Sequence, residues 1–190
     1  STPGPFTCAL TALGWVPAGR MVRRAGARPG DRLLVSGTIG DATLGLAAVH
    51  GQIDDPEGQL AYRYRLPNPR LDLREILAKH ATAAADVSDG LVADVRHLSE
   101  AGGVRIRLDL DTLPLSGATA TWLESQPDVG ASLLRLATGG DDYEVVCAMP
   151  ADTPKPAGFT VIGEVLQGQG IEVRAAGRIV DPGAGGWRHG

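Results

Sequence analysis

Hydrophobic and polar residues change their spacing repeatedly along this chain, and the changes predict an alternation of strands and helices. Residues 90–101 place apolar side chains three and four positions apart, which is typical of an amphipathic helix. Residues 104–110 alternate apolar and charged side chains, as a half-exposed strand does. The same reasoning predicts strands at 6–16, 32–36, 81–87, 104–110, 143–149, 159–166, 171–174 and 178–181, and helices at 41–49, 57–65, 71–79, 90–101, 117–125 and 130–137. We therefore expect an α/β fold, more broadly α+β, with a mixed sheet packed by helices.

A proline-rich break at 67–69 divides this pattern into two parts. Residues that precede proline avoid helical backbone, so the sequence PNP interrupts the helical segments on either side. We predict a domain boundary here, with residues 1–66 as a remnant of an N-terminal α/β domain and residues 67–190 as a C-terminal domain. The chain begins with a serine and enters a strand pattern almost at once, so we expect that an upstream segment is missing.

Charge and composition narrow the classes of function. Among 190 residues, 18 are Lys or Arg and 22 are Asp or Glu, which gives a net charge of −4. This balance argues against general electrostatic binding of nucleic acid or of an anionic membrane. The apolar runs are shorter than the ~18 residues of a membrane span. Cys8 and Cys147 lie far apart in apolar segments, which favours buried thiols in a reducing cytoplasm over a disulfide.

The segment 85–91 (ADVSDGL) has the clearest chemical character. It follows a predicted buried strand and precedes a predicted helix, a position where α/β proteins bind ligands. Asp86 and Asp89 would repel each other unless a cation or a proton lies between them. Mg²⁺ prefers such hard oxygen ligands and commonly adds phosphate oxygens to one or two carboxylates. A structural interpretation stays open, in which Asp89 caps the helix and Asp86 is a turn residue.

Two glycine-containing segments give weaker indications. In 138–144 (TGGDDYE), paired glycines would let the backbone approach a ligand, and acidic residues follow directly. The alternative is a helix end with Gly139 in the left-handed conformation, followed by a solvated acidic turn. The segment 36–41 (SGTIGD) lacks both the lysine of a Walker loop and GxGxxG spacing, so a tight turn is the simpler interpretation.

Two kinds of side chain outside these segments suit ligand binding. Arg23 and Arg24 offer guanidinium groups, whose geometry matches phosphate, although arginines in a turn are more often simply solvated. Trp187 lies in a glycine-rich tail, where it would either stack on a flat ligand ring or fold back on the core.

Taken together, these segments resemble the thiamine-monophosphate kinase family, in the superfamily of aminoimidazole ribonucleotide synthetase and selenophosphate synthetase. The order and spacing of the pieces extend over essentially the whole chain, and DVSDGL and GGDDYE are the most specific of them. The resembling pieces are 24–31 (RAGARPGD), 36–41 (SGTIGD), 67–70 (PNPR), 86–91 (DVSDGL), 139–144 (GGDDYE) and 186–189 (GWRH).

The resemblance implies ATP-dependent phosphorylation of thiamine monophosphate to thiamine diphosphate, by direct Mg²⁺-assisted transfer. It assigns Asp86 and Asp89 to Mg²⁺. It assigns Arg24 and Ser88 to ATP as co-substrate. It assigns Asp141 and Trp187 to the thiamine substrate, with Trp187 against the ring system. Phosphoryl transfer needs positioning and charge neutralisation more than covalent chemistry, so such a site suits an acidic protein.

The chain departs from the family pattern in three ways. Asp141 stands where the family usually has Glu, and Gly190 replaces its usual closing aromatic residue. The resemblance also begins partway through the family's N-terminal ATP-binding and dimerisation domain, so residues 1–66 would be a remnant of that domain with a linker helix. We therefore expect little or no activity from this chain alone.

The remaining expectations concern the full-length protein and the alternatives. The resemblance implies a cytoplasmic homodimer that binds neither nucleic acid nor membrane. One alternative is another ATP-dependent synthetase of the same superfamily, which would share the fold and the acidic ATP site. A second alternative is a non-catalytic remnant that binds a nucleotide weakly.

Overall fold

The computed structural model describes residue 4 and residues 8–183, and a mixed sheet of seven strands forms its centre. The strands lie in the order β2-β4-β1-β5-β3-β6-β7. Strands β3 and β6 run parallel, while the other neighbouring pairs of this sheet are antiparallel. The bounds are β1 Asp31–Ser36, β2 Ala83–Asp86, β3 Arg105–Asp109, β4 Val145–Pro150, β5 Phe159–Leu166, β6 Gly170–Ala175 and β7 Arg178–Val180. The expected α/β fold with a mixed sheet is confirmed.

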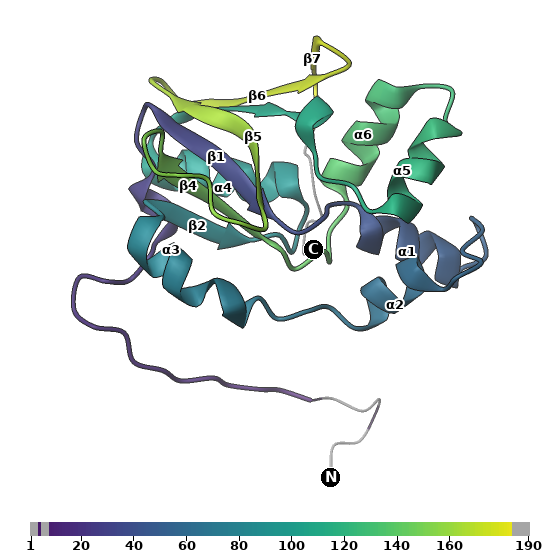
Figure 1. Cartoon of the computed structure of the whole chain (residues 1–190), viewed down its shortest axis with the longest axis horizontal. Coiled ribbons are helices and arrows are strands. Elements are labelled where there is room, and N and C mark those ends of the chain that lie inside the picture. Colours follow the sequence, from purple (N-terminus) through teal and green to yellow (C-terminus); the bar gives the residue numbers. More distant parts are fainter. Residues whose placement is uncertain (1–3, 5–7, 184–190) are drawn as a thin grey trace.

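Six α-helices of the described chain surround this sheet. Figure 1 shows α1, α2, α5 and α6 gathered at one end of the molecule, beside the sheet. The helices are α1 Asp41–Val49, α2 Gln59–Arg65, α3 Arg74–His80, α4 Leu91–Gly102, α5 Gly117–Glu124 and α6 Val129–Thr138, with short 3₁₀ helices η1 Arg24–Gly26, η2 Leu71–Leu73 and η3 Leu110–Thr112.

The core lies on both faces of the sheet. In β1, Leu33 and Val35 belong to a large hydrophobic cluster with residues of α4 and α6, whereas Leu34 belongs to a second cluster with Cys147 and Phe159. Successive strand residues point to opposite faces. A central strand buried on both faces therefore has an almost continuous apolar sequence, which explains why RLLVS could be predicted as a strand.

The prediction of a strand at 6–16 is wrong for the part of it that the structure describes. Residues 8–16 have no regular secondary structure, and Leu10, Leu13 and Trp15 are almost fully exposed. A strand needs a neighbour for its backbone hydrogen bonds and a surface for its apolar side chains, and this segment has neither among the described residues. Cys8 is exposed as a consequence, against the expectation of a buried thiol, while Cys147 is buried as expected. The other predicted strands and helices are found close to their predicted bounds.

The predicted boundary at 67–69 lies in an irregular, exposed stretch between α2 and η2. Strand β1, which precedes it, lies between β4 and β5, which follow it. The division at residue 66 stays a prediction. Among the described residues, each helix is too short or too polar to cross a membrane.

Candidate functional site

The two acidic segments singled out in the sequence lie side by side. Strand β2 pairs with β4 in antiparallel register, so the loop that leaves β2 meets the loop that enters β4. Backbone hydrogen bonds continue this pairing into the loops. Val87 N–H donates to the Glu144 carbonyl at 2.8 Å, Tyr143 N–H to Val87 at 2.8 Å, and Asp141 N–H to Ser88 at 2.9 Å. Sheet topology therefore joins motifs that lie about fifty residues apart in the sequence.

Glycines allow this close approach. A Cβ atom added at Gly140 would lie 2.3 Å from the Ser88 carbonyl oxygen, and one added at Gly90 would lie 2.6 Å from the Thr138 carbonyl oxygen. Gly90 also has a φ of +118°, which side chains rarely tolerate. The glycines thus have a packing role between the two loops.

Asp94 of α4 holds the loop 86–90 in place. Its buried carboxylate accepts hydrogen bonds from the backbone N–H of Ser88 at 3.0 Å and of Asp89 at 3.2 Å. Burial raises the pKa of Asp94 to about 6, with smaller contributions from the charges of Asp89 and Asp86, and the two N–H bonds oppose this shift. Ligand atoms of Asp89, Asp94 and His97 all lie within 4.8 Å of one another.

The sequence analysis overlooked Asp94, although a signal was present. The residue lies between Leu91 and Leu98 on the apolar face of the amphipathic helix. A carboxylate on such a face is costly unless it is hydrogen-bonded, so its position indicated a structural or functional partner.

Some side chains of the loop 139–144 are buried, and others face solvent. The buried Asp142 carboxylate accepts hydrogen bonds from the backbone N–H of Gly40 at 2.8 Å and of Ala42 at 3.1 Å, at the start of α1. Burial raises the pKa of Asp142 to about 7, although these two hydrogen bonds and the charge of Arg63 lower it. Asp142 is therefore an anchor for the loop and not a solvated acid.

Glu144 is the second internal anchor of this loop. Its buried carboxylate accepts a hydrogen bond from Ser36 Oγ at 2.5 Å and forms ion pairs with Arg63, at 2.7 Å, and with Arg70. Arg63 also donates to the Asp142 carbonyl at 2.7 Å. The network ties α2 and the segment after it to the acidic loop. The motifs contained Ser36, Arg70 and Glu144, but their pairing and the role of Arg63 were missed, because nothing in the sequence pairs Glu144 with two arginines more than seventy positions away.

Asp141 and Tyr143 point the other way, toward solvent. Both have left-handed backbone, with φ of +69° and +50°, and the Tyr143 hydroxyl lies 3.3 Å from Asp141 Oδ1. Gly139, in contrast, has a φ of −76°, so the alternative of a left-handed glycine followed by a solvated turn is wrong. Positive φ in a bulky residue such as tyrosine is strained, and strain of this kind gathers at functional sites.

A cavity of about 710 Å³ lies between the two loops and helices α1 and α2. Its walls combine two tyrosines, two carboxylates, and small or apolar side chains. The lining residues are Ala42, Thr43, Leu46, Tyr64, Ser88, Asp89, Thr138, Gly139, Gly140, Asp141 and Tyr143.

The structure brings most of the predicted site residues to this region. Ser88, Asp89 and Asp141 line the cavity. Asp86, at the end of β2, lies 3.7 Å from the guanidinium of Arg24 in η1, and both side chains are more than half exposed. Trp187 lies outside the described residues. The segment 36–41 forms the turn between β1 and α1, as the simpler interpretation predicted. Asp41 in this segment is buried and accepts hydrogen bonds from three hydroxyl groups.

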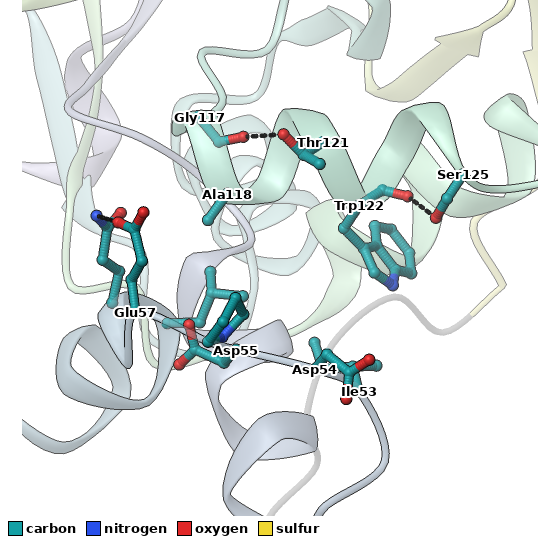
Figure 2. A pocket seen from close by; sticks show the side chains of 12 residues that line it. Ile53, Asp54, Asp55, Glu57, Gly117, Ala118, Thr121, Trp122 and Ser125 are labelled. Atoms are coloured by element: carbon teal, nitrogen blue, oxygen red, sulfur yellow. Dashed lines mark hydrogen bonds between the residues drawn. The ribbon is translucent and has the colours of Figure 1, made fainter.

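A second cavity of about 720 Å³ is also acidic, but it contains none of the predicted site residues. Figure 2 shows Asp54, Asp55 and Glu57 on the segment before α2, with Trp122 on α5. Asp55 already accepts a hydrogen bond from the backbone N–H of Ala61, at 2.9 Å. The Trp122 ring packs under the Arg135 guanidinium, 5.4 Å from the ring centroid.

Comparisons with known proteins agree with this geometry. The family model described as AIR synthase related protein, C-terminal domain, matches residues 28–176. Thiamine-monophosphate kinase of Caulobacter vibrioides is 47% identical over 100% of this chain and 56% of its own length. The enzyme of the same name from Aquifex aeolicus is 37% identical over 90% of this chain and 55% of its own. The solved structure described as AaThiL complexed with AMPPCP and TMP superimposes with a TM-score of 0.77 at 36% identity, covering 88% of this chain and 54% of that one.

The chain therefore belongs to the family of AIR synthase related proteins, of which it contains the C-terminal domain. Within that family, the relatives reported above by sequence are thiamine-monophosphate kinases. The chain spans about half of their length.

Proposed function

We propose that this chain is part of a thiamine-monophosphate kinase, which phosphorylates thiamine monophosphate to thiamine diphosphate with ATP. The observation that supports this most directly is the joining of the two acidic loops by three backbone hydrogen bonds beside one cavity. Sequence identity of 47% over the whole chain supports the same reaction. The complex of AaThiL with AMPPCP, an ATP analogue, and TMP supports ATP and thiamine monophosphate as the two ligands.

In this proposal, Asp86 and Asp89 hold Mg²⁺, and Arg24 and Ser88 bind ATP. The donor set suits the ion because carboxylates are hard oxygen ligands, and Asp86 is more than half exposed, with a long, solvated ion pair to Arg24 at 3.7 Å. The guanidinium of Arg24 lies next to Asp86, where it would contact a phosphate oxygen. Bound Mg²⁺ would neutralise phosphate charge beyond what the single guanidinium of Arg24 supplies.

Asp141 and Trp187 bind the thiamine substrate in the same proposal. Asp141 lies at the cavity on strained backbone, with its carboxylate near the Tyr143 hydroxyl. A phosphate oxygen of the substrate then attacks the γ-phosphorus of ATP in line, and ADP leaves without a phosphoenzyme. For this reaction the protein mainly has to bind the phosphates of ATP and thiamine monophosphate and to orient them.

We also propose that the full-length protein is a cytoplasmic homodimer and that residues 1–66 belong to its N-terminal ATP-binding and dimerisation domain. Because the chain spans 56% of the Caulobacter relative, we expect little or no activity from it alone. The same partial coverage favours one alternative, a remnant that binds nucleotide without catalysis.

Calorimetric titration of the chain with Mg²⁺-ATP, with and without thiamine monophosphate, tests the proposal. We expect saturable heat that depends on Mg²⁺ and is lost in Asp86→Asn. Asp54→Asn is the matched control, because that carboxylate lies at the other acidic cavity. Loss of heat in both variants, or in neither, would contradict the assignment of Asp86. Release of ADP that requires thiamine monophosphate, measured on the full-length parent, separates the kinase from both alternatives.

A further inference from the structure

We propose that Tyr64 and Tyr143 form the two aromatic walls of a subsite that selects the positively charged ring system of the substrate. The proposal rests on the proposed function and extends it to side chains that neither the sequence motifs nor the resemblance assigned a role. Both tyrosines line the cavity between the acidic loops and helices α1 and α2.

The charge of this cavity determines which part of a ligand it can take. Asp89 and Asp141 line it, and no lysine, arginine or histidine of the described chain is among its lining residues. A phosphate group that enters without Mg²⁺ would meet two carboxylates and no compensating cation among the lining residues. An organic cation would be attracted by the same carboxylates and by the electron-rich faces of the phenol rings.

Tyr143 is placed at this cavity by a strained backbone. Its φ is +50°, and the residue is 41% exposed, although the neighbouring Asp142 and Glu144 are buried. Its own N–H donates to the Val87 carbonyl, which fixes the conformation. Burial raises the pKa of Tyr143, and the charge of Asp141 adds to the shift, so the phenol stays protonated and can donate to Asp141. Strain that exposes an aromatic ring beside a cavity is typical of a binding position.

Tyr64 is fixed relative to Tyr143 by two separate contacts of α2. A Cβ atom added at Gly45 of α1 would lie 2.7 Å from Tyr64 Cβ, so the two helices pack closely at this point. Arg63, the preceding residue, pairs with Glu144 and with the Asp142 carbonyl on the loop that bears Tyr143. The two rings therefore belong to one connected unit, as a preformed aromatic subsite requires.

Thiamine has the chemistry that this cavity favours, because its thiazolium ring is cationic and its aminopyrimidine ring is flat and aromatic. Its phosphate would then lie outside the cavity, toward Asp86 and Arg24. The adenine of ATP is a neutral ring, so the two carboxylates attract it less strongly than they attract thiazolium. The subsite thus separates the rings of the two ligands by charge.

Thiamine without a phosphate, titrated into the whole chain in the absence of Mg²⁺ and ATP, tests the subsite directly. We expect saturable binding that weakens about tenfold in Tyr64→Leu and in Tyr143→Leu. The phenylalanine variants should retain most of the affinity, since they keep the rings. Tyr62→Leu is the matched control: Tyr62 lies on the same helix, is 65% exposed and lines a different cavity.

A glycine variant tests whether lost thiamine affinity comes from the missing ring or from a disturbed fold. Tyr143→Gly removes the ring and relaxes the positive φ, so we expect the melting temperature to be kept or raised while thiamine affinity falls. Three results would overturn the proposal: no saturable thiamine binding, unchanged affinity in both leucine variants, or displacement of thiamine by adenosine. Because the assay contains neither ATP nor Mg²⁺, failure of the kinase reaction in the full-length parent would leave its outcome unaffected.

Discussion

The two acidic cavities of this protein have almost the same volume, yet their carboxylates are held in different ways. At the cavity of Figure 2, Glu57 is exposed and Asp55 bonds to a residue six positions away. Beside the cavity between the acidic loops, Asp142 and Glu144 are buried and bind groups from distant segments of the chain, and the buried Asp94 holds the loop 86–90. Acidic residues close together in sequence are common on protein surfaces. A set of buried anchors that leaves particular carboxylates facing a cavity is much more specific to a site.

The largest expected difference between the two regions is in the free energy of unfolding. Glu144→Gln leaves Arg63 and Arg70 without their buried carboxylate, and we expect it to cost about 3–5 kcal/mol. Glu57→Gln alters an exposed side chain that contacts Gln59, and should cost about 0.5 kcal/mol or less. Urea denaturation of both variants measures the contrast. Similar costs for the two would show that Glu144 is not an anchor.

The second prediction concerns how the free energy of unfolding depends on pH through the buried Asp142. The pKa of Asp142 is about 7 in the folded chain, against its ordinary value of 3.8, because the side chain is buried. Between these pH values the folded chain holds a proton that the unfolded chain has lost. The resulting stability is fully present below pH 3.8 and is lost as the pH rises to about 7, at up to about 1.4 kcal/mol per pH unit.

Asp142→Asn isolates this effect from other titrating groups. Asp94, whose pKa is raised to about 6, contributes in the same direction and stays in the variant. We therefore expect the variant to lose stability less steeply than the parent between pH 4 and 7. Chemical denaturation at several pH values gives both slopes, and equal slopes would mean that the Asp142 pKa is not raised.

Glycine packing provides a third, smaller contrast. Gly140→Ala would press a methyl group against the Ser88 carbonyl, and we expect it to cost about 1–3 kcal/mol. Gly117, at the start of α5 beside the other cavity, has no atom within 4 Å of an added Cβ. Gly117→Ala should stabilise the chain by about 0.4–1 kcal/mol, because it restricts the unfolded state. Thermal melts of the two variants should shift in opposite directions.

The sequence predicted the elements well wherever local pattern and burial agree. Strand β1 and helix α4 have apolar residues at the spacing that the fold then buries. The segment 8–16 has the same composition as a buried strand, but pairing with a neighbour is a property of the fold and cannot be read from the segment itself. Composition therefore identified the apolar character of this segment and not its structure.

The site, like the fold, could be predicted only as far as local sequence patterns specify it. The short acidic motifs were visible, and the pairing of β2 with β4 explains why they meet. The anchors were not visible, because Asp94 and Arg63 lie outside the motifs and no pattern in the motif 67–70 pairs its Arg70 with the distant Glu144. Tyr64 reaches the cavity through the packing of α2 on α1, which no local pattern specifies.

The smallest effect on stability is expected at Arg24, where the proposed effect on function is large. Its ion pair with Asp86 spans 3.7 Å between two side chains that are more than half exposed, so water screens most of the attraction. We expect Arg24→Ala to change the free energy of unfolding by about 0.5 kcal/mol or less. The same variant should weaken binding of Mg²⁺-ATP severalfold, because it removes a charge-assisted contact to phosphate. Calorimetry and urea denaturation of one preparation measure both quantities. A variant that lost stability without losing nucleotide affinity would make Arg24 a structural residue, and the contrast between anchoring and ligand-facing side chains would no longer hold there.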